Sequence, residues 1–205
     1  MRRKRRNPTS SRASSRPVPA KDILRLLKGG DRRSIGRANE VADLVSKNPT
    51  LFPALIRGLW SEDRLVRMRA ADAIEKVTRA SHSLLQPCKQ ELLGLMKTAR
   101  EPELRWHLAV IVPRLWLTSN ERKRAAVLLH VFVQDQSSIV RTSALQGLAD
   151  FAQQDRAIRA DVIKILHQAL RDGTPAMKAR SRKLLVKLKI KPTRRRGVED
   201  QPEVS

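Results

Sequence analysis

The chain is poor in aromatic residues, with three Phe, three Trp and no Tyr among 205 residues. Sequence-specific recognition of single-stranded nucleic acid needs several exposed rings on which bases stack, so this small supply argues against it. Cys88 is the only cysteine, which excludes an internal disulfide and leaves stability to side-chain packing. We expect this lone thiol to be buried and inert rather than a nucleophile.

Acidic residues are scarce as well, because Asp and Glu number 20 against 43 Lys and Arg, for a formal net charge of +23. Residues 1–20 hold seven basic residues and no acid, and residues 191–205 hold four basic and three acidic residues. The remainder therefore keeps 32 basic and 17 acidic residues, a net charge of +15. A body this basic attracts polyanions, although a solubilising surface in a basic proteome would explain the same charge.

No stretch reaches the roughly 18 uninterrupted apolar residues that a membrane span requires. The basic N-terminus lacks the apolar run of a secretory signal. Pro8, Pro17 and Pro19 oppose the amphipathic helix of a transit peptide. We therefore expect a cytoplasmic protein, associated with the nucleoid in a bacterium or located in the nucleus of a eukaryotic host.

Motifs that carry catalysis or metal binding are missing too. The four histidines, His82, His107, His130 and His167, have no second histidine or glutamate at metal-ligand spacing. No glycine-rich phosphate loop and no nucleophile elbow occurs in the sequence. We therefore predict a non-enzymatic protein with no catalytic residue, no metal and no cofactor.

What the chain does have is a basic residue that recurs about every 37 residues, near the start of an apolar-periodic segment such as 66–74. A period of this length is typical of stacked helical pairs, none of which can bury its apolar face alone. Such an array acts through an extended surface, so we expect a binding face rather than a catalytic pocket. The recurring residues are Arg67, Arg105, Arg141 and Lys178.

Apolar spacing near 3.6 residues continues from residue 21 to residue 190, and no segment alternates as a strand would. The composition predicts a disordered basic arm at 1–20, a repeat domain at 21–190 and a disordered tail at 191–205. Within the repeat domain the predicted helices are 23–27, 38–45, 51–60, 66–77, 84–96, 104–117 with a kink at Pro113, 121–133, 139–151, 157–170 and 175–188.

The segment from Glu62 to Ile74, EDRLVRMRAADAI, resembles HEAT repeats: an acid precedes the first helix, followed by Val-Arg and an alanine-rich face. The resemblance covers about 31–190 and is strongest in the copies that begin with Arg67 and Arg141. It implies an all-α fold, an α-solenoid or superhelix of about four HEAT-like helical-hairpin repeats. It implies little about function, because this family provides scaffolds in many unrelated settings.

In HEAT-like proteins the acid and the arginine of this motif form a ladder that links neighbouring repeats. Asp, Ser and Thr at the acid position also suit the start of a helix. The resemblance therefore implies a structural role, rather than ligand contact, for both members of each pair. The pairs are Asp63 with Arg67, Glu101 with Arg105, Ser137 with Arg141, and Thr174 with Lys178.

Basic residues outside this ladder gather on two of the expected second helices. Second helices line the concave surface of a HEAT-like stack, so the resemblance implies a continuous basic stripe there. A helix start with free N–H groups also suits a phosphate. The predicted nucleic-acid contacts are Arg122, Lys123, Arg124, Arg156, Arg159, Lys164 and Arg171, with Arg2, Arg3, Lys4, Arg5 and Arg6 of the arm. With few aromatics, such binding would be phosphate-led, non-specific and steeply salt-dependent.

Two other functions stay open. A protein–protein adaptor would grip a helix or acidic segment of a partner on its concave face, and would lose far less affinity in salt. A HEAT-like DNA glycosylase would use Trp, Asp and Arg on that face. We expect Trp60, Trp106 and Trp116 to pack in the core or between repeats, which would leave such an enzyme few rings. The only carboxylate that we consider for this role is Asp161, beside Arg159.

Overall fold

The structure is a computed structural model that describes residues 20–31 and 34–189, and every element in these residues is a helix. The all-helical prediction is therefore confirmed. No strand occurs in this part of the chain. The predicted arm and tail, with Arg2 to Arg6, lie outside the described residues, apart from Ala20 at the start of the first helix.

The helices fall into a first row and a second row that alternate along the chain. The first row comprises α1 (Ala38–Lys47), α3 (Arg64–Ala80), α5 (Pro102–Ile111), α7 (Ser138–Gln154) and α9 (Pro175–Lys189). The second row comprises α2 (Phe52–Ile56), α4 (Lys89–Thr98), α6 (Ser119–Val133) and α8 (Arg159–Asp172). The other helical elements of the described residues are short 3-10 helices: η1 (Ala20–Leu27), η2 (Pro49–Leu51), η3 (Arg57–Trp60), η4 (His82–Cys88), η5 (Val112–Arg114) and η6 (Arg156–Ile158).

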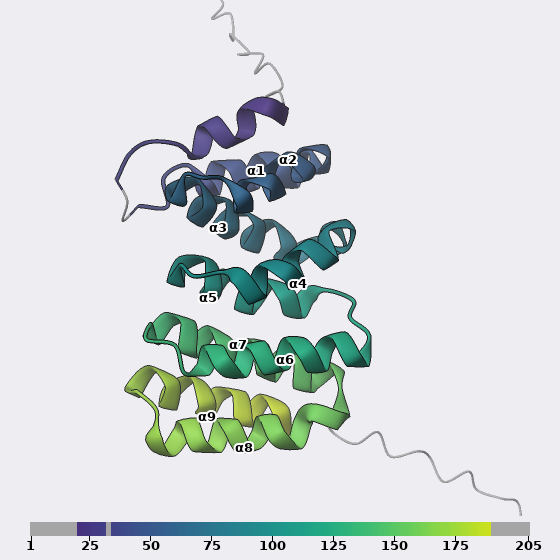
Figure 1. Ribbon diagram of the computed structural model, residues 1–205, viewed down its shortest axis with the longest axis vertical. Coiled ribbons are helices and arrows are strands. Elements are labelled where there is room, and N and C mark those ends of the chain that lie inside the picture. The colour runs from purple at the N-terminus through teal and green to yellow at the C-terminus, as the bar shows by residue number, and fades with distance from the viewer. Residues whose placement is uncertain (1–19, 32–33, 190–205) are drawn as a thin grey trace, which may run out of the picture.

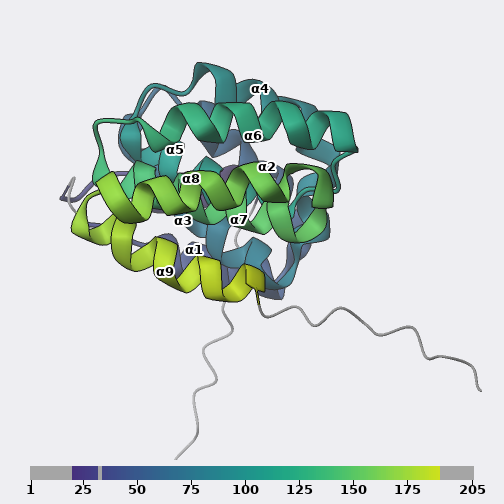
Figure 2. The same cartoon turned by 90° about the horizontal axis from the view of Figure 1, so that it is seen from below.

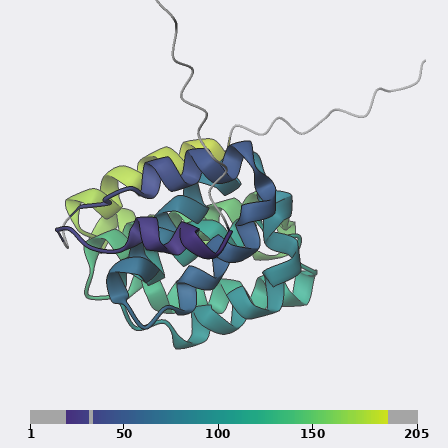
Figure 3. The same ribbon diagram turned by 90° about the horizontal axis from the view of Figure 1, so that it is seen from above.

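The elements stack in chain order from η1 at one end to α8 and α9 at the other (Figure 1). Each first helix packs on the next, α1 on α3, α3 on α5, α5 on α7 and α7 on α9, while α6 and α8 also pack on the first helix that follows them. The stack is bowed, because α1 and α9 lie toward one side while α4 and α5 are set back (Figures 2 and 3). First helices therefore line the inner side of the bow, and the expectation that second helices do so is wrong.

One apolar core runs through the whole stack. Ile74, Leu108, Leu145 and Leu148 from three successive first helices are almost completely buried. A first helix in the middle of the row is covered by a first helix on each side and by second helices behind it. This two-sided burial explains why α3, α5 and α7 carry apolar residues on more than one stripe.

Several helix starts and stops follow from local chemistry. Gly29 and Gly30 end the first helical segment with φ values of +71° and +79°, which glycine adopts at little cost. The Asp63 side chain accepts a hydrogen bond from the Leu65 N–H at 2.8 Å and caps α3. Thr174 precedes α9, whose first residue is proline.

Four predicted helices are divided, two of them at a proline, and the fourth is 157–170, whose first two residues lie in η6 before α8 begins. Segment 51–60 divides into α2 and η3, and segment 84–96 divides into η4, which contains Pro87, and α4. Pro113 ends α5 instead of kinking it, since α5 stops at Ile111 and only η5 follows. Proline has no N–H to donate to the carbonyl four residues earlier, here that of Ala109. The chain therefore leaves the helix before Trp116.

Candidate functional site

Five of the predicted phosphate contacts lie exposed on neighbouring elements of the outer side of the bow. They form what we call the basic face: Lys123 and Arg124 on α6, Arg156 on η6, and Lys164 and Arg171 on α8. Figure 1 shows α6 and α8 side by side. Of these five cations only Lys164 forms an ion pair with another described residue, at 3.2 Å from Asp161, and both side chains are largely exposed. Such a pair contributes little, so all five cations remain available to a ligand.

The other two predicted contacts are held inside the fold. Arg122 Nη1 donates to Asp155 at 3.1 Å and Arg122 Nη2 donates to the Leu117 carbonyl at 2.9 Å, with only 14% of the side chain exposed. The Arg159 guanidinium donates to the carbonyl of Leu188 near the end of α9. Both residues therefore join neighbouring layers, and we remove them from the set of phosphate contacts.

The start of α6 is also not the open anion site that its N–H groups suggest. Thr118 Oγ1 accepts a hydrogen bond from the Glu121 N–H at 3.3 Å, and the Glu121 carboxylate accepts one from the Thr118 N–H at 2.8 Å. This is a capping box, with Thr118 as the N-cap. The carboxylate supplied by the chain itself occupies the position that a phosphate would take.

Glu121 joins two layers of the stack as well, because Lys89 Nζ of α4 lies 2.9 Å from its carboxylate. The hydrogen bond from Lys89, followed by that from the Thr118 N–H, lowers the pKa of Glu121 to about 2, from an ordinary value of 4.5. A depressed carboxyl pKa stabilises the folded chain above the ordinary value. That stabilisation is lost as the pH falls from about 4.5 toward about 2.

We therefore expect Glu121→Gln to unfold at lower urea concentration than the unchanged chain at neutral pH. The gap between the two should close as the pH falls through this window, because Glu121 is then protonated in both states. Urea midpoints measured over a pH series test this. Glu91→Gln is the control, since Glu91 is exposed on α4 and should show no such gap. A gap that persists in acid would assign the effect to packing rather than to charge.

The predicted ladder exists in part. Arg67 forms an ion pair with Glu101 at the start of the next first helix. Arg105 pairs with Asp135 at 2.5 Å, two residues before the expected Ser137. These contacts tie α3 to the start of α5, and α5 to the loop before α7.

The remaining ladder positions act differently. Asp63 caps its own helix, and the Thr174 hydroxyl accepts a hydrogen bond from the Met177 N–H at 3.4 Å. Arg141 and Lys178 form no ion pair within the described residues, and Arg141 Nε is buried without a partner there. The sequence period therefore marks equivalent positions in the stack, but only two of the four bases link repeats through an acid.

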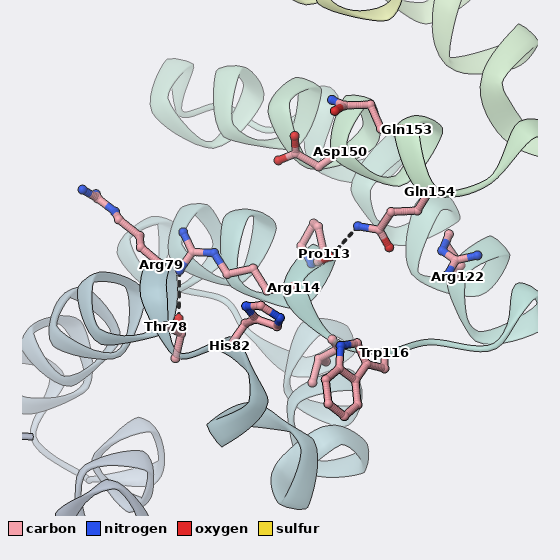
Figure 4. A pocket seen from close by; sticks show the side chains of 11 residues that line it. Thr78, Arg79, His82, Pro113, Arg114, Trp116, Arg122, Asp150, Gln153 and Gln154 are labelled. Atoms are coloured by element: carbon pink, nitrogen blue, oxygen red, sulfur yellow. Dashed lines mark hydrogen bonds between the residues drawn. The ribbon is translucent and has the colours of Figure 1, made fainter. Parts of the chain in front are cut away.

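A pocket of about 690 Å³ lies at the carboxyl ends of three first helices (Figure 4). It exists because α5 has only 10 residues whereas α3 and α7 on either side have 17 each. Pro113 thus determines the position of the pocket by ending α5 early. We call it the Trp116 pocket. It is lined by Thr78, Arg79, His82, Pro113, Arg114, Leu115, Trp116, Arg122, Asp150, Gln153 and Gln154.

One wall of the Trp116 pocket is a buried carboxylate shared by two arginines. Arg79 Nε and Nη2 donate to Glu75 at 2.9 and 2.6 Å. Arg114 donates to the same carboxylate and to Thr78 Oγ1, the latter at 2.8 Å. Burial alone would raise the pKa of Glu75, but the hydrogen bonds from Arg79 and Arg114 outweigh it and the pKa is lowered. Two cations and one anion leave this wall with a net charge of +1.

The ring of Trp116 is 65% exposed, although the sequence led us to expect it in the core. His82 lies edge-on to it, with ring centroids 6.3 Å apart. Trp60 is also exposed, at 47%, whereas Trp106 is partly buried against the core. The signal that would have placed Trp116 correctly is Pro113, if it is interpreted as the end of a helix rather than as a kink within it.

Other candidate chemistry is not assembled in the described residues. They contain no group of three or more His, Cys, Asp or Glu side chains that could hold a metal ion. Asp161, the carboxylate considered for a glycosylase, lies exposed on α8 and is not in the Trp116 pocket. Burial, followed by nearby Glu91, raises the pKa of the Cys88 thiol, which disfavours the reactive thiolate.

Within the described residues, no helix combines the length and the apolar character needed to cross a membrane.

No protein-family model matches this chain, and a search of the curated proteins finds no match either. The resemblance to HEAT repeats therefore rests on the motif residues themselves. Any function must be argued from the two surfaces described above, the basic face and the Trp116 pocket.

Proposed function

We propose that this chain is a non-enzymatic, HEAT-like α-solenoid of about four helical-hairpin repeats that binds nucleic acid through its phosphates. The stacking of first helices in chain order supports the solenoid. The observation that carries the function is the basic face, where five exposed cations lie on adjacent elements of a body whose net charge is +15. Four of these five form no ion pair with another described residue.

The mechanism is neutralisation of charge. Each cation that contacts a phosphate releases a condensed counterion, so affinity falls as salt rises, with a log–log slope of about −0.9 per contact on duplex DNA. Five contacts give a slope of about −4 to −5. Phosphates carry no sequence information, so binding to duplexes is independent of sequence.

A salt titration with a generic DNA duplex tests the proposal. We expect steep salt dependence in the full chain and in a form that lacks residues 1–19, which precede the first helix. Replacing Lys123 and Arg124 by Ala should weaken binding and make the slope shallower by about 2. Circular dichroism checks that the fold is intact.

The matched control removes two exposed cations elsewhere, Lys47 at the end of α1 and Arg57 on η3. It has the same total charge as the test variant. If both double variants weaken binding equally, overall charge and not the basic face governs affinity, and the proposed site is wrong. If the form that lacks residues 1–19 does not bind the duplex, the arm alone binds nucleic acid, and the folded part has a different function.

That other function would be a protein–protein adaptor, which one observation favours. Val127 and Val131, one turn apart on α6, are 65% and 62% exposed. Grooves lie on both sides of this helix, one beside Leu93 of α4 and one beside Ile165 of α8. A partner helix with an apolar stripe and acidic flanks fits this ridge, since Lys123 lines one of the grooves. Binding of that kind would survive salt that removes DNA.

A further inference from the structure

We propose that the Trp116 pocket binds an unpaired segment of a nucleic-acid strand, with one base stacked on the Trp116 indole and the phosphate of a neighbouring nucleotide at Arg79, at the opposite end of the pocket (Figure 4). The inference rests on the proposed function and adds to it a preference for single-stranded regions, loops or ends. The basic face would hold the backbone of any nucleic acid. The pocket at the carboxyl ends of the first helices would select strands that offer a free base.

The pocket has the size and rigidity that such a ligand requires. Its volume of about 690 Å³ lies within the range of roughly 300–1,000 Å³ that is usual for small-ligand sites. Gln154 Nε2 donates to the Pro113 carbonyl at 2.8 Å and fixes the turn that forms its floor (Figure 4). Pro113 and Leu115 are themselves buried, so the floor is continuous with the core. A ligand here meets a preformed surface.

Trp116 supplies the stacking surface. A largely exposed indole leaves apolar area in water, and the edge-on contact with His82 covers only part of the ring. Every base has a flat face that stacks on such a ring regardless of sequence. Bases within a duplex are already stacked and paired, so only an unpaired base can reach Trp116 without melting the duplex.

Arg79 supplies a contact for the phosphate of a neighbouring nucleotide. Its side chain is 66% exposed, and only its Nε and Nη2 are engaged by Glu75, which leaves Nη1 available to a ligand. Arg114 is tied to Glu75 and Thr78 and holds this wall in place. The wall has a net charge of +1, which suits a single phosphate rather than a long stretch of backbone.

The α7 wall supplies polar groups for the edge of the base. Asp150 is held by Lys187 at 3.3 Å and by Gln146 at 2.9 Å, so its charge is balanced. Gln153 Nε2 has no hydrogen-bond partner within the described residues. If the amide turns toward a ligand, this donor gains the partner that it lacks, and the group offers both a donor and an acceptor. Amides of this kind read unstacked bases.

The test compares labelled oligothymidylate of about ten nucleotides with a blunt duplex, at one salt concentration, using the full chain. Trp116→Ala should weaken single-strand binding roughly ten-fold and leave duplex binding unchanged. Trp116→Phe should retain most of the single-strand affinity, because a phenyl ring also stacks. Trp60→Ala is the matched control, an exposed tryptophan outside the pocket, and should alter neither affinity.

Two results would overturn the inference. One is an unchanged single-strand affinity in Trp116→Ala, and the other is an equal loss for both nucleic acids, which would mean phosphate contact alone. Thymidine monophosphate forms a third arm. If it binds as tightly as the oligonucleotide in a Trp116-dependent manner, the pocket takes a free nucleotide and the strand is not its ligand.

Failure of the proposed function is distinguishable from failure of this inference. If Lys123→Ala with Arg124→Ala leaves duplex binding unchanged while Trp116→Ala still weakens single-strand binding, the Trp116 pocket is a binding site and the basic face is not. If duplex binding depends on the basic face but Trp116→Ala has no effect, the basic face is a binding site and the Trp116 pocket is not. Because Trp116 is exposed, its removal should leave the melting temperature unchanged, which circular dichroism checks.

Discussion

Replacing Arg69 by Leu is expected to destabilise the folded chain by about 3–5 kcal/mol, a large part of the stability of an ordinary domain. Arg69 lies on α3 with only 2% of its surface exposed. Its guanidinium donates to four backbone carbonyls, those of Leu27 at 2.8 Å, Gly29 at 2.5 Å, Asp31 at 3.0 Å and Ser34 at 3.2 Å. Leucine fills only part of the volume and satisfies none of these acceptors, which then lose the guanidinium as their partner.

The loop between η1 and α1 is built around this one side chain. Gly36 has a φ of +52°, and a Cβ at that position would lie 2.6 Å from Arg69 Cζ. The loop therefore approaches the guanidinium as closely as backbone can. Without Arg69, the first helical segment would lose the contact that docks its end on α3, and unfolding should begin there.

Urea denaturation of the full chain measures the effect, with Arg64→Leu as the control. Arg64 lies on the same helix and pairs with Glu103 at 2.8 Å, but both side chains are substantially exposed. Its loss should cost no more than about 1 kcal/mol. Arg69→Lys should be intermediate, since an ammonium group has only three donors. If Arg69→Leu is no worse than Arg64→Leu, the guanidinium does not organise the loop.

The features that the sequence predicts well depend on short stretches of chain. Helical periodicity, the cap at Asp63 and the proline start of α9 involve residues within one or two turns of each other. The period of the basic residue also predicts that equivalent helices stack, because each segment is too short and too amphipathic to be stable alone. These predictions need no knowledge of distant contacts.

The sequence does not predict which arginines are free to contact a ligand. Arg122 and Lys123 are neighbours in sequence, yet Arg122 is buried against Asp155 and Lys123 is exposed. The partners of Arg122 and Arg114 come from 33 and 39 residues away. Neighbouring residues in the sequence do not indicate such a distant partner. A run of basic residues therefore predicts a charged surface, but not which of its side chains lack an acidic partner. Arg69 was missed for the same reason.

The direction of the bow and the exposure of Trp116 were also beyond the sequence, for two separate reasons. The bow results from small rotations between successive layers, which depend on how side chains fit across each interface. The position of Trp116 depends on whether Pro113 kinks α5 or ends it, and both are compatible with proline chemistry. In the structure the second outcome opens the Trp116 pocket.

The close approach of α5 and α7 beside that pocket leads to the second large effect. Gly147→Ala is expected to destabilise the chain by about 3 kcal/mol, although alanine normally favours a helix. A Cβ on Gly147 would lie 2.2 Å from the carbonyl oxygen of Ala109 and 2.9 Å from Leu129 Cδ1. That carbonyl belongs to the backbone of α5 and cannot rotate away, so the two helices would have to separate. Gly94→Ala on α4 is the control, because nothing lies within 4 Å of its Cβ position, and it should stabilise the chain by up to about 1 kcal/mol.

Urea midpoints of the two variants should therefore shift in opposite directions, and equal shifts would show that α5 and α7 are less tightly packed than described. The same pair of variants links the fold to the pocket. Pro113 is the residue that ends α5, and its Cγ would lie 3.3 Å from the new Cβ of Gly147→Ala. Separation of the helices would thus move the floor of the Trp116 pocket. Gly147→Ala should weaken single-strand binding more than duplex binding under conditions where the chain is still folded, and Gly94→Ala should alter neither.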